Sequence, residues 1–200
     1  EYQVRIDSTL SKGRLNYGEI IIRGASEKEI LISTYICHPS MANNELSGPV
    51  VTTMVAKWLL EQDSLQYTYR IIFVPETIGS IAYISQNLEL LKRNVLGGMV
   101  ITCVGDDNQY SLLSSKDEDS VLDLIGNNVL HYHSDDQYTK YSYLNRGSDE
   151  RQYSSVGVDI PVISLMRSKY GEYDEYHTSL DNMEFISEKG LEGGYQIHKK

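Results

Sequence analysis

The sequence predicts a three-layer α/β/α sandwich built on a mixed, mostly parallel β-sheet. Two observations support this fold class. Four apolar, β-branched runs have the length of buried strands, and they lie at residues 30–36, 69–74, 99–104 and 160–166. Segments of helical length separate these runs, which is the order expected when helices cover both faces of a sheet.

The spacing of apolar residues predicts the remaining elements. Residues 2–6 alternate, residues 12–13 indicate a turn, and residues 19–23 are β-branched, so a hairpin is expected to enter the sheet. Residues 49–62 place Val51, Val55 and Leu59 on one face at helical spacing, which predicts a helix packed on the sheet. Further helical segments are expected at residues 80–93, 118–131 and 148–156 and from about residue 187.

Length, charge and cysteine content limit the class of protein. Two hundred residues are enough for one domain with a sizeable core. A formal net charge of -10 argues against nucleic-acid binding, which requires clustered positive charge. Two cysteines do not make a disulfide framework, and no apolar run reaches the ~20 residues of a membrane span, so a cytoplasmic protein is expected. The start at Glu1, without methionine, predicts an excised part of a longer protein.

Polar side chains follow the predicted strands at the points where those strands end. His38, Glu76, Asp106 and Arg167 each come just after an apolar run, and His177 lies in a long polar loop. Because ligands bind at the carboxyl ends of strands in open α/β sheets, we expect a site at this edge. Two histidines beside acidic residues are the ligand types that zinc accepts.

Four motifs occur in the order CHPSMANNELSG, FVPETIGS, GSDERQY and EYHTSLD. On these motifs the chain resembles a family of aminopeptidase-like proteins of uncertain function, associated with surface-polysaccharide biosynthesis. That family is related to the zinc-dependent exopeptidases of the bacterial leucyl aminopeptidase type. The resemblance runs from about residue 2 to residue 186 and implies a zinc-exopeptidase-like fold with a metal site at the carboxyl edge of the sheet.

The resemblance also implies roles for individual residues. His38 and His177 match the two histidine ligands, and Glu76 matches the general base that activates water. A second glutamate ligand is replaced by Thr77, and an acidic ligand on the next strand is replaced by Thr102. One zinc ion is therefore expected rather than two.

One metal ligand stays open between two neighbouring residues. The bridging aspartate of the related enzymes matches Asn44, which stands beside Glu45. Glu45 is slightly preferred as the ligand, because an anionic oxygen binds a divalent cation better than an amide oxygen does.

Four further residues are candidates for supporting or substrate-binding roles. Asp181 could cap a helical turn or orient His177, and Asp106 could belong to a solvated turn or be recruited to the site. Asp149 could belong to a local ion-pair cluster or contact a substrate amine, and Arg167 could bind a substrate carboxylate or sugar.

Two functions from different classes remain. The first is a metal-dependent hydrolase of aminopeptidase or amidase type, in which zinc and Glu76 activate water to cleave a small peptide or an acylated amino sugar. The second is a catalytically degenerate aminopeptidase-like module that binds within surface-polysaccharide biosynthesis. The sequence contains no G-x-S-x-G elbow of a serine hydrolase, and it leaves homo-oligomerisation open.

Overall fold

The computed structural model describes residues 2–200 and contains a seven-stranded sheet with the order β1-β3-β2-β4-β7-β5-β6. The strands are β1 (Gly18–Ile22), β2 (Glu29–Tyr35), β3 (Thr68–Val74), β4 (Val95–Val100), β5 (Ser111–Leu113), β6 (Thr139–Tyr141) and β7 (Val162–Met166). The helices are α1 (Ser47–Leu60), α2 (Ile78–Asn94), α3 (Val121–His133), α4 (Glu150–Tyr153) and α5 (Glu188–Lys199). A π-helical turn, η1 (Ala42–Leu46), precedes α1, and a 3-10 turn, η2 (Tyr143–Asn145), precedes α4.

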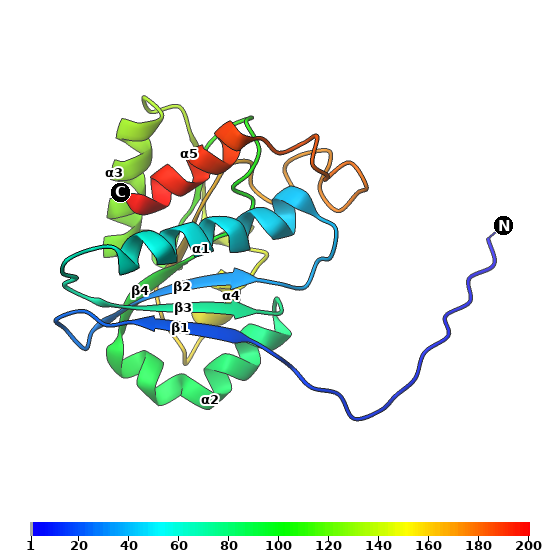
Figure 1. The fold of residues 1–200 in the computed structure, drawn as a ribbon, viewed down its shortest axis with the longest axis horizontal. Coiled ribbons are helices and arrows are strands. Elements are labelled where there is room, and N and C mark those ends of the chain that lie inside the picture. Colours follow the sequence, from blue (N-terminus) through cyan, green and yellow to red (C-terminus); the bar gives the residue numbers. More distant parts are fainter. Residues whose placement is uncertain (1) are drawn as a thin grey trace.

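The middle of the sheet is parallel, antiparallel pairs flank it on both sides, and the outermost pair of β5 with β6 is again parallel. Strand β2 pairs in parallel with β3 and β4, and β4 pairs in parallel with β7. Strand β1 runs antiparallel to β3 at one edge, and β5 runs antiparallel to β7. The carboxyl ends of β2 and β3 therefore point to the same side, which the loop between β7 and α5 also reaches (Figure 1). The predicted fold class is confirmed.

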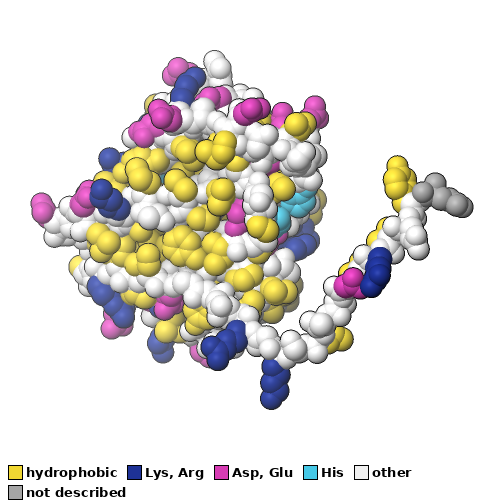
Figure 2. Space-filling model, turned by 45° about the vertical axis from the view of Figure 1, so that its right-hand side comes forward, with side chains coloured by type: hydrophobic (Ala, Val, Ile, Leu, Met, Phe, Trp, Pro, Cys, Tyr) yellow, Lys and Arg dark blue, Asp and Glu magenta, His cyan; other side chains and the backbone are white. Residues whose placement is uncertain are grey.

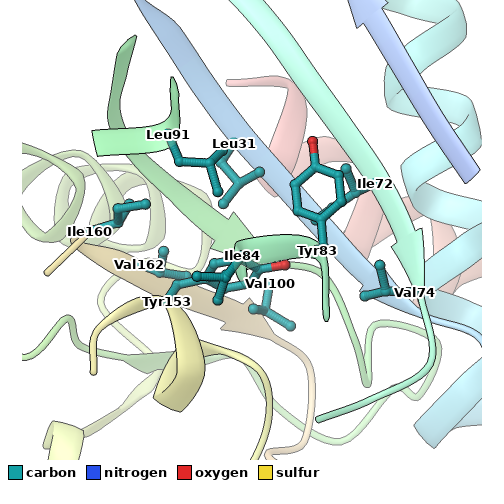
Figure 3. Close-up of a cluster of buried hydrophobic side chains, with 10 residues drawn as sticks. All are labelled: Leu31, Ile72, Val74, Tyr83, Ile84, Leu91, Val100, Tyr153, Ile160 and Val162. Atoms are coloured by element: carbon teal, nitrogen blue, oxygen red, sulfur yellow. The ribbon is translucent and has the colours of Figure 1, made fainter. Parts of the chain in front are cut away.

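Helices cover both faces of the sheet, as Figure 1 shows. Helices α1 and α5 pack on one face, where Val51 and Val55 contact a cluster that includes Ile32 and Ile71. Helices α2 and α4 pack on the other face, where Tyr83 and Tyr153 join strand residues in a second buried cluster (Figure 3). Within residues 2–200, no helix is both long and apolar enough to cross a membrane.

The predicted N-terminal hairpin is wrong. Residues 2–17 form neither a helix nor a strand, and Val4 and Ile6 are 80% and 81% exposed. This segment extends away from the body of the molecule (Figure 2), and the antiparallel partner of β1 is β3. Alternation makes a strand only where a sheet buries the apolar face, and here the apolar side chains stay in solvent.

One strand differs from its predicted position and two strands were not predicted, in each case for a local reason. Strand β4 starts at Val95 and ends at Val100, whereas the apolar run predicted residues 99–104. Its early part contains Gly97 and Gly98, and a Cβ at Gly98 would lie 2.5 Å from the Leu31 carbonyl oxygen. Glycine thus permits close pairing there but leaves no apolar pattern. Strands β5 and β6 have three residues each, too few to show a period.

A buried arginine connects the three strands β1, β2 and β3 at one edge of the sheet. The guanidinium of Arg70 on β3 donates from Nε to Glu29 Oε2 at 2.5 Å and from Nη2 to Glu29 Oε1 at 3.0 Å. Its Nη1 donates to Glu19 Oε1 at 2.6 Å and to the Tyr83 hydroxyl at 2.9 Å. The side chains of Arg70 and Glu29 are 7% and 2% exposed, so neither charge can turn to water instead.

Replacing Arg70 with methionine is expected to destabilise the protein by about 3–5 kcal/mol, because it leaves the Glu29 carboxylate buried without a partner. Denaturant unfolding monitored by circular dichroism measures this change. Lys57→Met is the matched control, since its ion pair with Glu61 is 75% and 62% exposed and should contribute about 1 kcal/mol or less. Equal losses in the two variants would contradict the expectation.

Candidate metal and catalytic site

The candidate site lies where the carboxyl ends of β2 and β3 meet the loop between β7 and α5 (Figure 1). His38 follows β2, Glu76 follows β3, and His177 stands in the loop. Asn44 and Glu45 belong to η1, which connects β2 to α1. The structure brings these five predicted residues together, and histidine surface is visible at the edge of the body in Figure 2.

The two ring nitrogens of His38 face two different carboxylates. Glu45 Oε2 accepts the backbone N–H of His38 at 2.7 Å and lies 3.2 Å from its Nδ1. On the other side of the ring, Nε2 lies 3.6 Å from Glu76 Oε2. When Nδ1–H donates to Glu45, the lone pair of Nε2 is free on the side of Glu76. This arrangement is the usual one for a metal-binding histidine whose second nitrogen is held by a carboxylate.

The second histidine lies beside the first. The ring centroids of His38 and His177 are 5.2 Å apart, and the rings are inclined by 36°. His177 Nε2 lies 3.0 Å from Asn44 Oδ1, and its ring stacks on Tyr176 at 3.9 Å. The imidazole nitrogen and the amide oxygen are both metal-ligand types, so this pair can exchange its shared proton for a cation.

Neutral groups occupy the positions where the resemblance implied further acidic ligands. Asn44 Nδ2 donates to the Tyr35 hydroxyl at 2.8 Å, and Thr102 Oγ1 donates to the Asn44 carbonyl at 3.1 Å. The Tyr35 and Thr102 hydroxyls also bond to each other at 2.5 Å. Burial raises the pKa of Tyr35 well above its ordinary value, so its hydroxyl stays neutral.

The chemistry of this donor set fits a divalent cation. His38, His177 and Asn44 offer two imidazole nitrogens and an amide oxygen, with the Glu76 carboxylate beside them. Thr77 and Thr102, at positions where the resemblance implied acidic ligands, contribute no negative charge.

Cys37 is a ligand-type residue that the sequence reasoning missed. Its Sγ lies 3.3 Å from His38 Nδ1, and ligand atoms of Cys37, His38 and Glu45 lie within 4.8 Å of one another. Burial, with the charges of Glu45 and Glu76, raises the pKa of Cys37 to about 11, so the thiol is protonated at neutral pH. The signal was its place directly before His38.

Ser148 is a second missed residue. Its hydroxyl donates to Glu76 Oε1 at 2.7 Å, which leaves Glu76 Oε2 on the side of His38. Ser148 stands in the GSDERQY motif, directly before three charged residues that are more typical site candidates. A hydroxyl has no charge or metal affinity that would make it conspicuous in a sequence.

Asp181 and Asp106 hold the backbone around the site. Asp181 Oδ1 accepts the N–H of Asn43 at 2.6 Å, and Oδ2 accepts the N–H of Asn44 at 3.0 Å, so Asp181 caps η1. Asp106 is fully buried rather than part of a solvated turn, and it accepts from Asn43 Nδ2 and from the Ser168 N–H, both at 3.0 Å. Neither carboxylate bonds to a histidine ring among these contacts.

Arg167 is engaged in packing. Its Nε donates to the Asp106 carbonyl at 2.7 Å, its guanidinium lies 3.9 Å from the centre of the Tyr110 ring, and the residue is 5% exposed. A planar cation held in this way has little freedom to bind a substrate. The arrangement therefore argues against the expected role of Arg167 in binding a substrate carboxylate or sugar.

Asp149 is fully buried next to the site. Its Oδ1 accepts the backbone N–H of Thr77 and the Ser80 hydroxyl, both at 2.8 Å. Its Oδ2 is buried and has no hydrogen-bond partner among the described residues. Burial, reinforced by the charges of Glu76 and Glu150, raises the pKa of Asp149 to about 7.

This raised pKa predicts a pH-dependent cost for the folded state. Above the unfolded pKa of about 4, the unfolded chain loses a proton that the folded chain keeps, so Asp149 lowers stability as pH rises towards 7. Asp149→Asn is expected to gain stability relative to the wild type over this window, by up to about 1.4 kcal/mol per pH unit. Urea unfolding at several pH values measures the difference, with the exposed residue change Asp63→Asn as the control. Parallel curves for wild type and Asp149→Asn would contradict the prediction.

Comparisons with solved structures define the class of protein. The zinc aminopeptidase BSAP from Bacillus subtilis matches 92% of this chain with a TM-score of 0.72 and 17% identity, over 47% of its own chain. A glutaminyl cyclase from Porphyromonas gingivalis also matches 92% of this chain, with a TM-score of 0.72 and 18% identity, over 76% of its own chain. At such low identity these matches show a common α/β fold.

The family model "Domain of unknown function (DUF4910)" matches residues 5–200, and the chain belongs to this family. A Clostridium acetobutylicum protein named "Putative polysaccharide biosynthesis protein with aminopeptidase-like domain" is 46% identical over 198 residues, which are 99% of this chain and 45% of that protein. A crystal structure of a "putative peptidase" from the same organism has a TM-score of 0.87 and 45% identity over 92% of this chain and 42% of its own. The predicted resemblance is confirmed, and the chain spans less than half the length of these relatives.

Proposed function

We propose that this chain carries a hydrolase site of aminopeptidase or amidase type that uses one zinc ion. The observation that carries the proposal is the position of Glu76, whose Oε2 lies 3.6 Å from His38 Nε2 while the His177 ring stands 5.2 Å from the His38 ring. A carboxylate beside two imidazoles is the set of groups that water activation by a metal and a general base requires.

The ligands of the ion would be His38, His177 and the amide oxygen of Asn44. Glu45 remains an alternative ligand, but its contacts with the backbone N–H and Nδ1 of His38 favour a role in orienting that ring. A bound zinc ion supplies Lewis acidity, which polarises a carbonyl group and makes water more acidic.

Glu76 acts as the general base of the proposed reaction. Its Oε1 is held by the Ser148 hydroxyl, so its Oε2 accepts the proton of the attacking water and returns it to the leaving amine. Water attacks the amide carbonyl carbon, the C–N bond breaks, and the products are a carboxylate and an amine.

The substrate class follows from the chemistry of the site and from the relatives. The proposed reaction cleaves an amide, and the similar proteins are named for peptidase-like domains and for polysaccharide biosynthesis. We therefore propose a small peptide or an acylated amino sugar as the substrate. The free thiols of Cys37 and Cys103 support a reducing, cytoplasmic location for this reaction.

A second candidate function rests on the neutral network around Asn44. Its hydrogen bonds with Tyr35 and Thr102 involve residues that match metal-ligand positions in related enzymes but carry no charge. Such a network favours a folded scaffold that binds partners within polysaccharide biosynthesis without catalysing hydrolysis.

Glu76→Gln is expected to lower kcat for release of amine from aminoacyl anilides or acylated amino sugars by at least 100-fold, because the amide cannot take the proton. Chelation should abolish the wild-type activity and zinc should restore it. Glu61→Gln, at an exposed position after α1, is the matched control and should keep full activity. An unchanged kcat in Glu76→Gln would contradict the proposed role of Glu76 as the general base.

Metal analysis separates the two candidate functions. The hydrolase proposal expects about one zinc per chain after dialysis, and a loss of at least tenfold in zinc affinity in both His38→Ala and His177→Ala. His131→Ala is the control, because His131 pairs with Asp136 at an exposed position. A wild-type chain that takes up no zinc at micromolar concentration would favour the binding module.

A further inference from the structure

Thr77 follows the proposed general base and has an unusual backbone conformation. Its φ is +62° and its ψ is -69°, so a β-branched residue occupies a region that favours glycine. Residues in such regions keep their conformation only when their surroundings hold them there, at a cost of roughly 1–3 kcal/mol. The φ and ψ of Thr77 are those of a γ-turn with positive φ, in which the Ile78 N–H donates to the Glu76 carbonyl at 2.7 Å. Because such a turn is strained, we expect contacts from outside the turn to help hold it.

The segment of residues 148–151 contacts both Glu76 and Thr77 in this turn. The Ser148 hydroxyl donates to Glu76 Oε1 at 2.7 Å, and Asp149 Oδ1 accepts the backbone N–H of Thr77 at 2.8 Å. The guanidinium of Arg151 donates to the Thr77 hydroxyl at 3.3 Å. Neighbouring residues of the segment thus contact neighbouring residues of the turn.

The segment is itself held firmly. Glu150 Oε1 accepts the N–H groups of Gly147 and Ser148 at 2.8 and 2.9 Å, and the Tyr170 hydroxyl at 2.6 Å. Ser148, Asp149 and Glu150 are 2%, 0% and 0% exposed. Asp149 Oδ2 is buried and has no hydrogen-bond partner among the described residues, which costs free energy. We therefore expect the position of this carboxylate beside Thr77 to have a structural or functional reason.

We propose that Asp149 is a positioning residue, which holds Thr77 in its left-handed conformation and thereby directs the Glu76 carboxylate towards His38. The proposal rests on the proposed function for the role of Glu76, but the geometry it concerns can be tested without activity. Loss of the Asp149 acceptor frees the Thr77 N–H, and the turn relaxes towards negative φ. Glu76, one residue earlier, then turns away from the ring of His38.

Crystal structures of variants test the geometry directly. In Asp149→Ala, Thr77 is expected to adopt a negative φ, and Glu76 Oε2 should move at least 1 Å farther from His38 Nε2. Asp149→Asn keeps an oxygen acceptor and should preserve both features. Ser85→Ala is the matched control, because its exposed hydroxyl on the same helix, α2, donates to the Ala82 carbonyl and not to Asp149 or Thr77. An Asp149→Ala structure with Thr77 and Glu76 unmoved would overturn the proposal.

Kinetics and a suppressor variant test the consequence. Asp149→Ala should lower kcat at least tenfold with KM within twofold of wild type, and Asp149→Asn should stay within threefold. Thr77→Gly in the Asp149→Ala background should recover at least threefold in kcat, because glycine adopts positive φ without strain. If Asp149→Ala does not fold, Asp149→Asn provides the test. A negative φ at Thr77 in Asp149→Asn, or a tenfold loss of kcat in that variant, would overturn the proposal.

The proposed function and the positioning role of Asp149 can fail separately. A wild-type chain that hydrolyses no amide removes the proposed function, and the structures of the Asp149 variants still decide whether Asp149 holds the turn. An active wild type, with Glu76 unmoved in Asp149→Ala, removes the positioning role and leaves the hydrolase.

Discussion

The site depends on one carboxylate that joins two distant parts of the chain. Asp181 accepts the N–H groups of Asn43 and Asn44 through its two side-chain oxygens, and its carbonyl accepts the N–H of Ala42 at 3.1 Å. These N–H groups belong to the start of η1 and have no partner within it. Because Asp181 follows His177 by four residues, the same contacts bring the second histidine to Asn44 and beside His38. An amide could accept at one oxygen only, so this position requires an aspartate.

Charge is distributed unevenly around the two imidazole rings. Glu45 and Glu76 lie beside His38, whereas Asn44 contacts the neutral hydroxyls of Tyr35 and Thr102. The negative groups favour a cation on one side of the imidazole pair, and the hydroxyl network satisfies its own hydrogen bonds without one. The chain thus combines an α/β fold shared with a zinc aminopeptidase with neutral contacts around Asn44.

Much of the fold could be predicted, because buried strands and buried helix faces show as apolar runs and apolar stripes in the sequence. The runs that became β2, β3 and β7, and the stripe of Val51, Val55 and Leu59 on α1, are apolar because both faces of the sheet are covered. Prediction failed where packing leaves no such trace. The alternating segment before β1 is not paired in the sheet, two glycines interrupt the apolar run of β4, and β5 and β6 are too short to show a period.

The sequence by itself determined the order of the long buried strands β2, β3 and β7 and of the main helices, and the identity of the polar residues that follow those strands, because these depend on composition and spacing. Only the tertiary structure decided which atoms face each other. It turned His38 Nδ1 to Glu45 and Nε2 to Glu76, buried Asp106 and Arg167 in packing contacts, and placed Ser148 and Asp149 against the Glu76 turn. These contacts join residues that lie between 7 and 72 positions apart, and the direction of each side chain is set by packing rather than by local pattern.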